Sequence, residues 1–534
     1  MTALPLQNYK YLPFQLLTQT GGFSMGKHYL NHHTFLALGV SGLLVLASLT
    51  GCSTSAATDS AITFTRSEMF TDRDQDASYD TAGSTTIRFT DDAITCEDDQ
   101  VSISDSTVTI SSGGTYILSG SSAQAQIIID TPDDDKVQLV LSDLTLSCET
   151  SAPIYVKNAD KVFITLADGS DNSLSTTGEF VQIDDNNIDA VIFSKEDLTL
   201  NGTGSLTITS AYGHGIVSKD DLVVTGGSYT MTCARHGLSG KDSVRILDGT
   251  FDLTTIKDGI HASNDDDEAL GYIYIAGGNF TICSQDDGMH ADSTLYIEDG
   301  TIDITESYEG LEGQTITILD GTISIVSSDD GINASGGSST TSGNEPQKPD
   351  GNRDTDTPPE KREFPDGGQP SDMTPPGGFG GNGGFDMDAD ESCSLTISGG
   401  DISIDAGGDG IDSNGYFYMT GGTVFVAGPE SNGDSALDYG ISASISGGTF
   451  LATGYSGMAQ SFSDDSEQCS YMVKLDTMIE ADSSTLTLTG AEGVVLLSHT
   501  TNKSYNCVIV SCPELTSGAT YTLTTGSSSQ EITP

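Results

Sequence analysis

Acidic residues recur beside a glycine at regular intervals along the middle of the chain. The residues before these glycines form one column: His214, His236, Asp258, Asp287, Glu309, Asp330 and Asp409. Three residues further on, a second column contains Val217, Ser239, His261, His290, Glu312, Asn333 and Asp412. Carboxylate and amide oxygens are the ligands that Ca²⁺ prefers in proteins. If successive repeats stack, the spacing predicts a calcium-binding corner, to which Asp286, Asp292 and Asp329 would add ligands.

Stacking these carboxylates would carry an electrostatic cost. Neighbouring strands lie about 4.8 Å apart, and two unit charges at that distance repel by about 1 kcal/mol in water and about 3 kcal/mol at an effective dielectric constant near 20. Either several of the acids are protonated or cations bridge adjacent repeats, and we favour calcium. For any single Asp-Gly pair, a simpler interpretation is a turn that uses the left-handed backbone conformation. Repetition of the acid in successive repeats favours the metal site.

Two other polar groups near these columns have less specific patterns. The four histidines of the columns could be ligands, but ring stacking with ordinary hydrogen bonds is the role we expect. The run GPESNGDSALDYG, residues 428–440, interrupts the repeat. It is either a glycine-rich capping loop or a cation site, with Asp434 and Asp438 as ligands, that closes the column after Asp409 and Asp412.

A glycine-rich motif followed by an apolar strand shares the period of the acidic columns. Its second glycines are Gly227, Gly249, Gly278, Gly300, Gly321, Gly400 and Gly422, mostly 21 or 22 residues apart. Short alternating strands bounded by glycine within such a period are typical of one coil of a β-solenoid. Alternation places two columns inward: Ile246, Ile275, Ile297, Ile318, Ile397 and Met419, and Phe251, Phe280, Ile302, Ile323, Ile402 and Val424. The sequence therefore predicts an all-β fold whose coils position the acids at one corner.

The repeat also sets the expected domain boundaries. We assign the solenoid domain to residues 61–459, with an extended, capping segment before its first coil near residue 100. The proline- and glycine-rich run 336–391 is expected to be a disordered loop inserted into one coil. Residues 460–534 lose the period and are predicted to form a small C-terminal β domain or cap.

Tyrosines recur on the predicted outward side of one strand of the repeat. They are Tyr272, Tyr274, Tyr296, Tyr416 and Tyr418. Their rings could stack on sugars, which makes them candidate carbohydrate-binding residues. The alternative, which we favour for the pattern alone, is that tyrosine is simply common on exposed strands.

The amino end has the features of a secretory leader. Residues 35–49 are apolar or small, and Leu49-Thr50-Gly51-Cys52 resembles a bacterial lipobox, in which the cysteine is diacylated. We therefore expect a signal peptide over 1–51, with Met25 as an alternative start, lipidation at Cys52 and a tether over 52–60. The alternative is an ordinary signal peptide with a chance cysteine. The resulting location is the extracellular face of the bacterial cytoplasmic membrane.

Charge and cysteine content narrow the classes of partner. With 20 basic and 77 acidic residues, the formal charge is -57, which excludes nucleic-acid binding and adsorption to anionic membranes through a basic patch. We expect a monomer that contacts the membrane only through its lipid. The eight cysteines after Cys52 include no CxxC pair; only Cys507 and Cys512 are close enough in sequence for a hairpin disulfide.

Several runs between about residues 85 and 530 resemble one family of bacterial surface proteins. They are TYILSG, KVQLVLSDLTL, ADKVFITLADGSDNSL, DDGMHAD, SYEGLEG, SSDDGINAS, GPESNGDSALDYG and YSGMAQSFS. These runs are similar to those of carbohydrate-binding domain-containing proteins. The resemblance implies a right-handed single-stranded parallel β-helix similar to that of pectate lyases, with calcium between coils. It also implies non-catalytic binding of plant polysaccharides such as cellulose and pectin.

Three functions remain open on sequence alone. The first is a lipid-anchored, calcium-dependent polysaccharide-binding protein. The second is a calcium-dependent pectate lyase, with Lys257 or Arg235 as the base, although the acid beside Lys257 would keep it protonated and make it a poor base. The third is a structural adhesin that binds protein.

Overall fold

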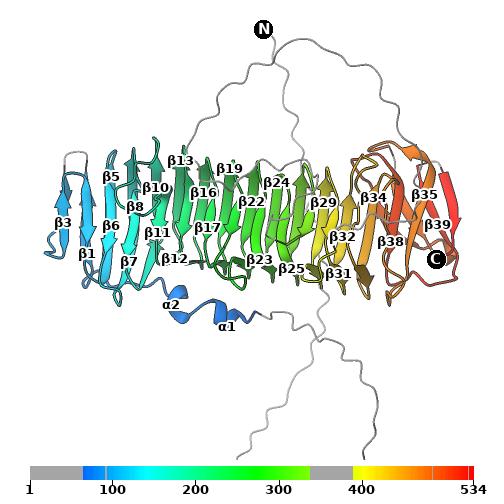
Figure 1. Ribbon diagram of the computed structural model, residues 1–534, viewed down its shortest axis with the longest axis horizontal. Helices are drawn as coiled ribbons and strands as arrows, with labels where there is room; N and C mark the ends of the chain where they lie inside the picture. The colour runs from blue at the N-terminus through cyan, green and yellow to red at the C-terminus, as the bar shows by residue number, and fades with distance from the viewer. Residues whose placement is uncertain (1–63, 91–92, 337–388, 484, 527) are drawn as a thin grey trace, which may run out of the picture. The chain divides into compact units, whose positions relative to one another are not determined.

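The computed structural model describes residues 64–90, 93–336, 389–483, 485–526 and 528–534, and these residues are nearly all β (Figure 1). The described helices are short: α1 (Arg66–Met69), α2 (Asp72–Gln75) and the 3₁₀ turn η1 (Ala491–Gly493). Among the described residues, no helix is long and apolar enough to cross a membrane. The expected leader, Cys52, its tether and most of the 336–391 insertion lie outside the described residues.

Most strands belong to three parallel ladders, which the chain visits in turn. Each strand therefore pairs with a strand of the previous repeat rather than with its neighbour in sequence. The first ladder contains β1 (Thr85–Phe89), β5 (Gly114–Ser122), β7 (Lys136–Cys148), β9 (Lys161–Leu166), β12 (Asp197–Gly202), β15 (Asp221–Val224), β18 (Ser243–Ile246), β21 (Tyr272–Ile275), β23 (Met289–Ile297), β25 (Leu311–Ile318), β28 (Ser394–Ile397), β31 (Tyr416–Met419) and β33 (Ser442–Ile445).

The second ladder starts from the ends of β5 and β7. It continues through β10 (Asp171–Thr176), β13 (Ser205–Ser210), β16 (Ser228–Cys233), β19 (Thr250–Thr255), β22 (Asn279–Ser284), β24 (Thr301–Glu306), β26 (Thr322–Ser327), β29 (Asp401–Ala406), β32 (Thr423–Ala427) and β34 (Thr449–Gly454).

The third ladder carries the acidic columns. It consists of β4 (Thr107–Ile110), β6 (Gln126–Asp130), β8 (Ile154–Asn158), β11 (Ala190–Ser194), β14 (His214–Ser218), β17 (Leu238–Gly240), β20 (Ile260–Ala262), the first residues of β23 and β25, β27 (Ile332–Ala334) and β30 (Ile411–Ser413).

The two predicted inward columns are confirmed. Ile246, Ile275 and Ile297 pair in register along the first ladder and are fully buried. On the second ladder, Phe251 and Phe280 stack with ring centroids 4.8 Å apart. Both columns belong to a single hydrophobic core that the three ladders enclose.

At both ends of the ladders, antiparallel strands join the parallel ones. The parallel pairing begins with β1, before residue 100, where β2 (Ile94–Thr95) and β3 (Val101–Ser104) add antiparallel pairs to β1 and β4. At the other end, β38 (Tyr505–Ser511) pairs antiparallel with β34 and with β35 (Ser470–Ile479). Residues 460–534 thus extend the main sheet; only β36 (Leu486–Thr489), β37 (Val495–His499), β39 (Tyr521–Thr525) and β40 (Ser528–Ile532) form a separate sheet.

The sequence predicted an extended, capping segment before the first coil. The residues around α1 and α2 instead form two short helical turns that do not cap the ladders. This segment lies along the side of the first ladder (Figure 1), and Asp74 of α2 contacts β12. The Asp74 side chain accepts hydrogen bonds from Thr71 and Thr199, both at 2.7 Å, and lies 2.9 Å from the Lys161 ammonium. We call residues 64–76 the strap.

Candidate metal and carbohydrate-binding face

The third ladder brings the predicted columns into register. Ser239 pairs with His261, His290 with Glu312, and Asn333 with Asp412. The preceding column lies at the turn that enters each of these strands. The sequence prediction that successive repeats place these residues at one corner is therefore confirmed.

Side chains of the first column bond the backbone of the next repeat. Oδ1 of Asp258 accepts the N–H of Asp287 at 3.1 Å, and Oδ1 of Asp287 accepts the N–H of Glu309 at 3.1 Å. Asp330 accepts the N–H of Asp409 at 2.6 Å in the same way. These bonds give each acid a structural role in addition to any role in metal binding.

Each column residue is followed by glycine because the backbone of the next repeat lies too close for a side chain. A left-handed backbone conformation is not the reason. These glycines do not have positive φ in the described residues, so the left-handed interpretation of the Asp-Gly pairs is wrong. A Cβ added to Gly259 would lie 2.7 Å from the Gly288 oxygen, and one on Gly331 would lie 2.5 Å from the Gly410 oxygen. The column can stack only because the following residue has no side chain.

The face divides into a histidine-rich half and an acidic half. In the first half, Asp258 lies 3.2 Å from His236 and 2.7 Å from His261. Burial would raise the pKa of Asp258, but the two rings hold that pKa well below its usual value. The first acid of the column, Asp258, thus differs from the later acids in having two histidine rings as partners.

Two further predicted ligands are held by cationic partners. Asp286 forms an ion pair with the Lys257 ammonium at 2.9 Å. Asp292 lies 3.4 Å from Nε2 of His290 and accepts the N–H of Asn264 at 3.0 Å. Burial lowers the pKa of His290, but Glu312, Asp287 and Asp292 together raise it well above its usual value. These contacts place Asp286 and Asp292 beside nitrogen partners rather than among oxygen ligands.

The four histidines form one stack, as expected. The ring centroids of His214 and His236 lie 4.9 Å apart, those of His236 and His261 4.1 Å, and those of His261 and His290 5.3 Å. Nδ1 of His236 accepts the N–H of Asp258 at 3.1 Å. Burial lowers the pKa of His236 to about 3, helped by the neighbouring His261, so this ring is neutral at physiological pH.

The acidic half gathers its carboxylates into two groups, and His290 contacts the first of them, at 3.3 Å from Asp287 and 2.5 Å from Glu312. Oxygens of Asp287, Glu309 and Glu312 lie within 4.8 Å of one another, and so do those of Asp330, Asp409 and Asp412. Burial raises the pKa of Asp330 to about 8, and the Asp409 carboxylate adds to the shift. Burial also raises the pKa of Asp409 to about 8, with Asp412 and Asp438 contributing. Taking Asp330 and Asp409 out of water as anions is therefore unfavourable without a cation.

The 428–440 loop closes the acidic half. The backbone N–H of Ser435 donates to Asp409, and Asp434 lies near enough to raise the pKa of Asp330 and Asp409. Asp438 is buried, and its burial raises its pKa. The loop thus ends the column and brings further acids to it.

Calcium fits the donor set of the acidic half. Nδ2 of Asn333 donates to Glu309 Oε2 at 3.0 Å, whereas its buried Oδ1 has no hydrogen-bond partner. Register places Asn333 between Glu312 and Asp412, so this oxygen lies among carboxylates. Gly408 keeps space beside Asp329 and Asp330, because a Cβ there would lie 2.4 Å and 2.6 Å from their oxygens. An oxygen-only site of this kind suits a hard divalent cation.

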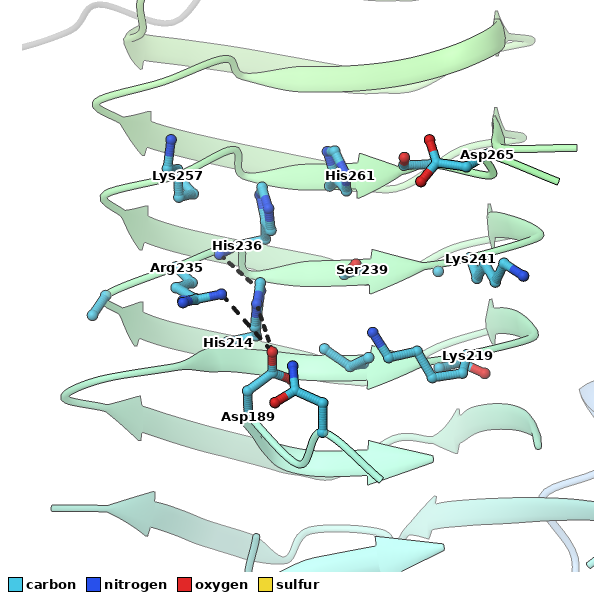
Figure 2. A pocket seen from close by; sticks show the side chains of 16 residues that line it. Asp189, His214, Lys219, Arg235, His236, Ser239, Lys241, Lys257, His261 and Asp265 are labelled. Atoms are coloured by element: carbon cyan, nitrogen blue, oxygen red, sulfur yellow. Dashed lines mark hydrogen bonds and ion pairs between the residues drawn. The ribbon is translucent and has the colours of Figure 1, made fainter. Parts of the chain in front are cut away.

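A basic cavity that the sequence did not predict as a unit lies over the histidine-rich half. Figure 2 shows its 16 lining residues, which include Arg235 and Lys257 on one side of the histidines and Lys219 and Lys241 on the other. The cavity has a volume of about 480 Å³. The sequence signal was the shared 22-residue spacing within each of these two pairs.

The tyrosine column is mostly covered. Tyr274 is 1% exposed and Tyr296 is 8% exposed, because Phe64 and Phe70 of the strap pack on them. The prediction that Tyr274 and Tyr296 face solvent is therefore wrong, and Tyr272 is half-buried beside them. Tyr418 is exposed, Tyr416 is half-buried, and their rings stack 5.7 Å apart on β31. These tyrosines are on the first ladder, not on the ladder of the acids.

Fold and site together define an acidic, mainly parallel β protein with a polar face built from repeats. A family model described as "carbohydrate-binding domain-containing protein" matches residues 104–347. A protein of that description from Acetivibrio thermocellus is 42% identical over 193 residues, which cover 36% of this chain and 67% of that protein. The chain belongs to the carbohydrate-binding domain-containing protein family.

One solved structure is also similar to part of the chain. It is described as the polysaccharide lyase-like protein from C. thermocellum, as a gadolinium derivative. It is 34% identical, and the match covers 41% of this chain and 89% of that chain with a TM-score of 0.39.

Proposed function

We propose that this chain is a calcium-dependent polysaccharide-binding protein that does not cleave its ligand. Family membership supports polysaccharide binding. The observation that carries the calcium dependence is the buried, unpartnered Asn333 Oδ1 among the carboxylates of the acidic half. Glu309, Glu312, Asp330, Asn333, Asp409 and Asp412 would hold the ions, with Asp287, Asp329, Asp434 and Asp438 beside them. Bound calcium would supply positive charge between repeats and a contact for glycan oxygens.

The fold that we propose for this function is a right-handed parallel β-helix. Its support is the order in which the chain visits three parallel ladders around one core. Such a fold presents its repeats as a flat, regular surface, which suits a chain of repeating sugars. A crystal structure would test the handedness.

Binding can be tested directly with the purified mature protein. We expect retention on polygalacturonate or cellulose in the presence of calcium, and loss of retention in a chelator. A protein that retained no polysaccharide but captured another protein would support the adhesin alternative. Tyr416→Ala/Tyr418→Ala would test the remaining tyrosine site; equal binding by this variant would remove these residues from the glycan contact.

A lyase is the second candidate, because Arg235 and Lys257 line the same cavity. The Lys257 ammonium is engaged in an ion pair with Asp286 at 2.9 Å, so it is not free to accept a proton from a substrate in the cavity. Incubation with polygalacturonate and calcium should therefore yield no unsaturated product. A rise in ultraviolet absorbance that is lost in Lys257→Ala would instead support the lyase.

We also propose that Cys52 carries a lipid that holds the protein at the extracellular face of the bacterial cytoplasmic membrane. The support is the apolar run before Leu49-Thr50-Gly51-Cys52. The wild-type chain should sediment with membranes and incorporate labelled fatty acid. Cys52→Ser should do neither.

A further inference from the structure

We propose that the basic cavity over the histidine-rich half binds the anionic substituents of an acidic polysaccharide. This inference rests on the proposed polysaccharide binding and names the class of glycan and the place where it binds. The lining has four basic residues and two acidic residues, whereas the chain has 20 basic and 77 acidic residues. This local excess of positive charge in so acidic a chain makes the cavity a place to which a polyanion would be attracted.

The four cations form two rows that flank the third ladder. Arg235 and Lys257 precede β17 and β20, while Lys219 and Lys241 follow β14 and β17. The backbone N–H of Lys241 bonds the oxygen of Ser218 in the previous repeat, so the members of a row are one repeat apart. Adjacent repeats are spaced by about 4.8 Å. A polymer with a charge on each sugar could therefore contact several of these cations at once (Figure 2).

Three of the four cations, Lys219, Arg235 and Lys241, are held loosely enough to accept a ligand, whereas Lys257 is paired with Asp286. Arg235 lies 3.9 Å from Asp189, and its side chain is 48% exposed. Lys241 pairs with Asp266, whose side chain is 79% exposed. Lys219 is exposed at the cavity rim, with its ammonium 5.8 Å from the Phe193 ring centroid. Exposed ion pairs of this kind contribute little, so a carboxylate or sulfate ester can replace the protein acid.

Between the two rows, the floor of the cavity is polar and uncharged at His236 and Ser239. His236 lies there with a stacked, neutral ring, and Ser239 follows it on β17. Ring faces and a hydroxyl group suit the neutral part of a sugar. Along the ladder the next repeats turn acidic, so a polyanion in the cavity would extend toward the calcium-binding half, where bound cations would attract it as well.

The test compares the calcium-saturated mature protein with Lys219→Gln/Arg235→Gln/Lys241→Gln. The probes are polygalacturonate, its methyl ester, dextran sulfate and cellulose. The triple variant should bind polygalacturonate about tenfold more weakly or worse. Its binding to cellulose should not change. Lys136→Gln/Lys157→Gln/Lys474→Gln is the matched control, because it removes the same charge from exposed positions outside the cavity and should bind within about twofold of wild type.

Lys219→Arg/Lys241→Arg should retain binding, which separates loss of charge from damage to the fold, and circular dichroism would check folding of every variant. Weaker binding of the methyl ester assigns the ligand to carboxylate; equally tight binding of dextran sulfate assigns it to anionic glycans generally. The inference fails if the folded triple variant binds polygalacturonate like wild type, or if wild type binds only neutral glycans. If wild type binds no polysaccharide at all, the proposed function itself fails.

Discussion

Asp330 and Asp409 lie in adjacent repeats, and both carboxyl groups have a pKa of about 8 in the absence of metal. These values exceed the usual value of 3.8, so the folded state binds more protons than the unfolded chain between about pH 4 and pH 8. Metal-free stability should therefore fall as the pH rises through that range. A divalent cation reverses the trend, because it binds the deprotonated groups.

Calcium should accordingly raise the melting temperature, and its affinity should increase between pH 6 and pH 8. At 100 times the dissociation constant, one site contributes about 2.7 kcal/mol to the free energy of unfolding. Thermal melts with calcium or with a chelator measure the effect.

Asp330→Asn/Asp409→Asn should flatten both the calcium response and the pH dependence. Asp299→Asn, at an exposed turn on a different part of the repeat, should leave both intact. A melting temperature that does not respond to the chelator in the wild type would contradict calcium binding at this corner.

The strap is the element whose position depends most on a single residue. Asp74 is 2% exposed, and although burial raises its pKa, Thr199, Thr71 and Lys161 lower it to about 2. A depressed pKa contributes stability above the unfolded value of 3.8, and this contribution is lost as the pH falls toward 2. The shift corresponds to about 2 kcal/mol at neutral pH.

Asp74→Asn should therefore increase hydrogen exchange in residues 64–76 at pH 6, with a difference from wild type that shrinks below pH 4. Asp72→Asn, at an exposed position of the same short helix, is the control. Equal exchange in wild type and Asp74→Asn would show that the aromatic contacts of Phe64 and Phe70 hold the strap without this carboxylate.

The two ends of the long insertion meet on the ladders. β25 pairs with both β27 and β28, which lie on either side of the insertion. A Cβ on Gly336 would lie 3.3 Å from Asp390 and 3.8 Å from Cys393, so the two ends are adjacent. Loop length itself has a small effect on stability.

Replacing residues 340–388 with a short glycine-serine linker should therefore change the melting temperature by less than about 3 °C. Calorimetry of the deletion variant measures this. Loss of cooperative unfolding would mean that the deleted residues stabilise the ladders.

At the scale of the whole molecule, the ladders need a closed end. β38 pairs in the antiparallel direction with β34, the last strand of the second ladder. Leu451 of β34 packs in a second core with residues of the C-terminal strands. Removal of residues 460–534 would expose this edge and its apolar side chains. We expect the truncated chain to aggregate in light scattering, whereas removal of residues 528–534 alone should leave it dispersed. A monomeric truncated chain would contradict this role for β38.

Periodicity determined what could be predicted from the sequence. The positions of Ile275 in the core and Asp287 at the corner could be predicted, because each residue belongs to a column that recurs at a nearly constant interval. Parallel strand pairing places residues separated by that interval next to one another. Tyr274 could not be placed correctly, because Phe64 and Phe70, which cover it, are about 200 residues away in sequence and have no repeat of their own. The basic cavity was missed for a related reason: one row precedes β17 and β20 and the other follows β14 and β17, so the two rows meet only across the third ladder.

The strap also determines how the ladders would bear a mechanical load. A pull on the chain before Phe64 would reach Arg66, which bonds Ala276 at 3.0 Å and Glu298 at 3.1 Å, and then Asp74 beside β12. The load would thus enter along the flank of the stack, across several repeats at once. It would reach β1 only after the strap had been sheared away, so the terminal strand would be shielded from being peeled off one hydrogen bond at a time.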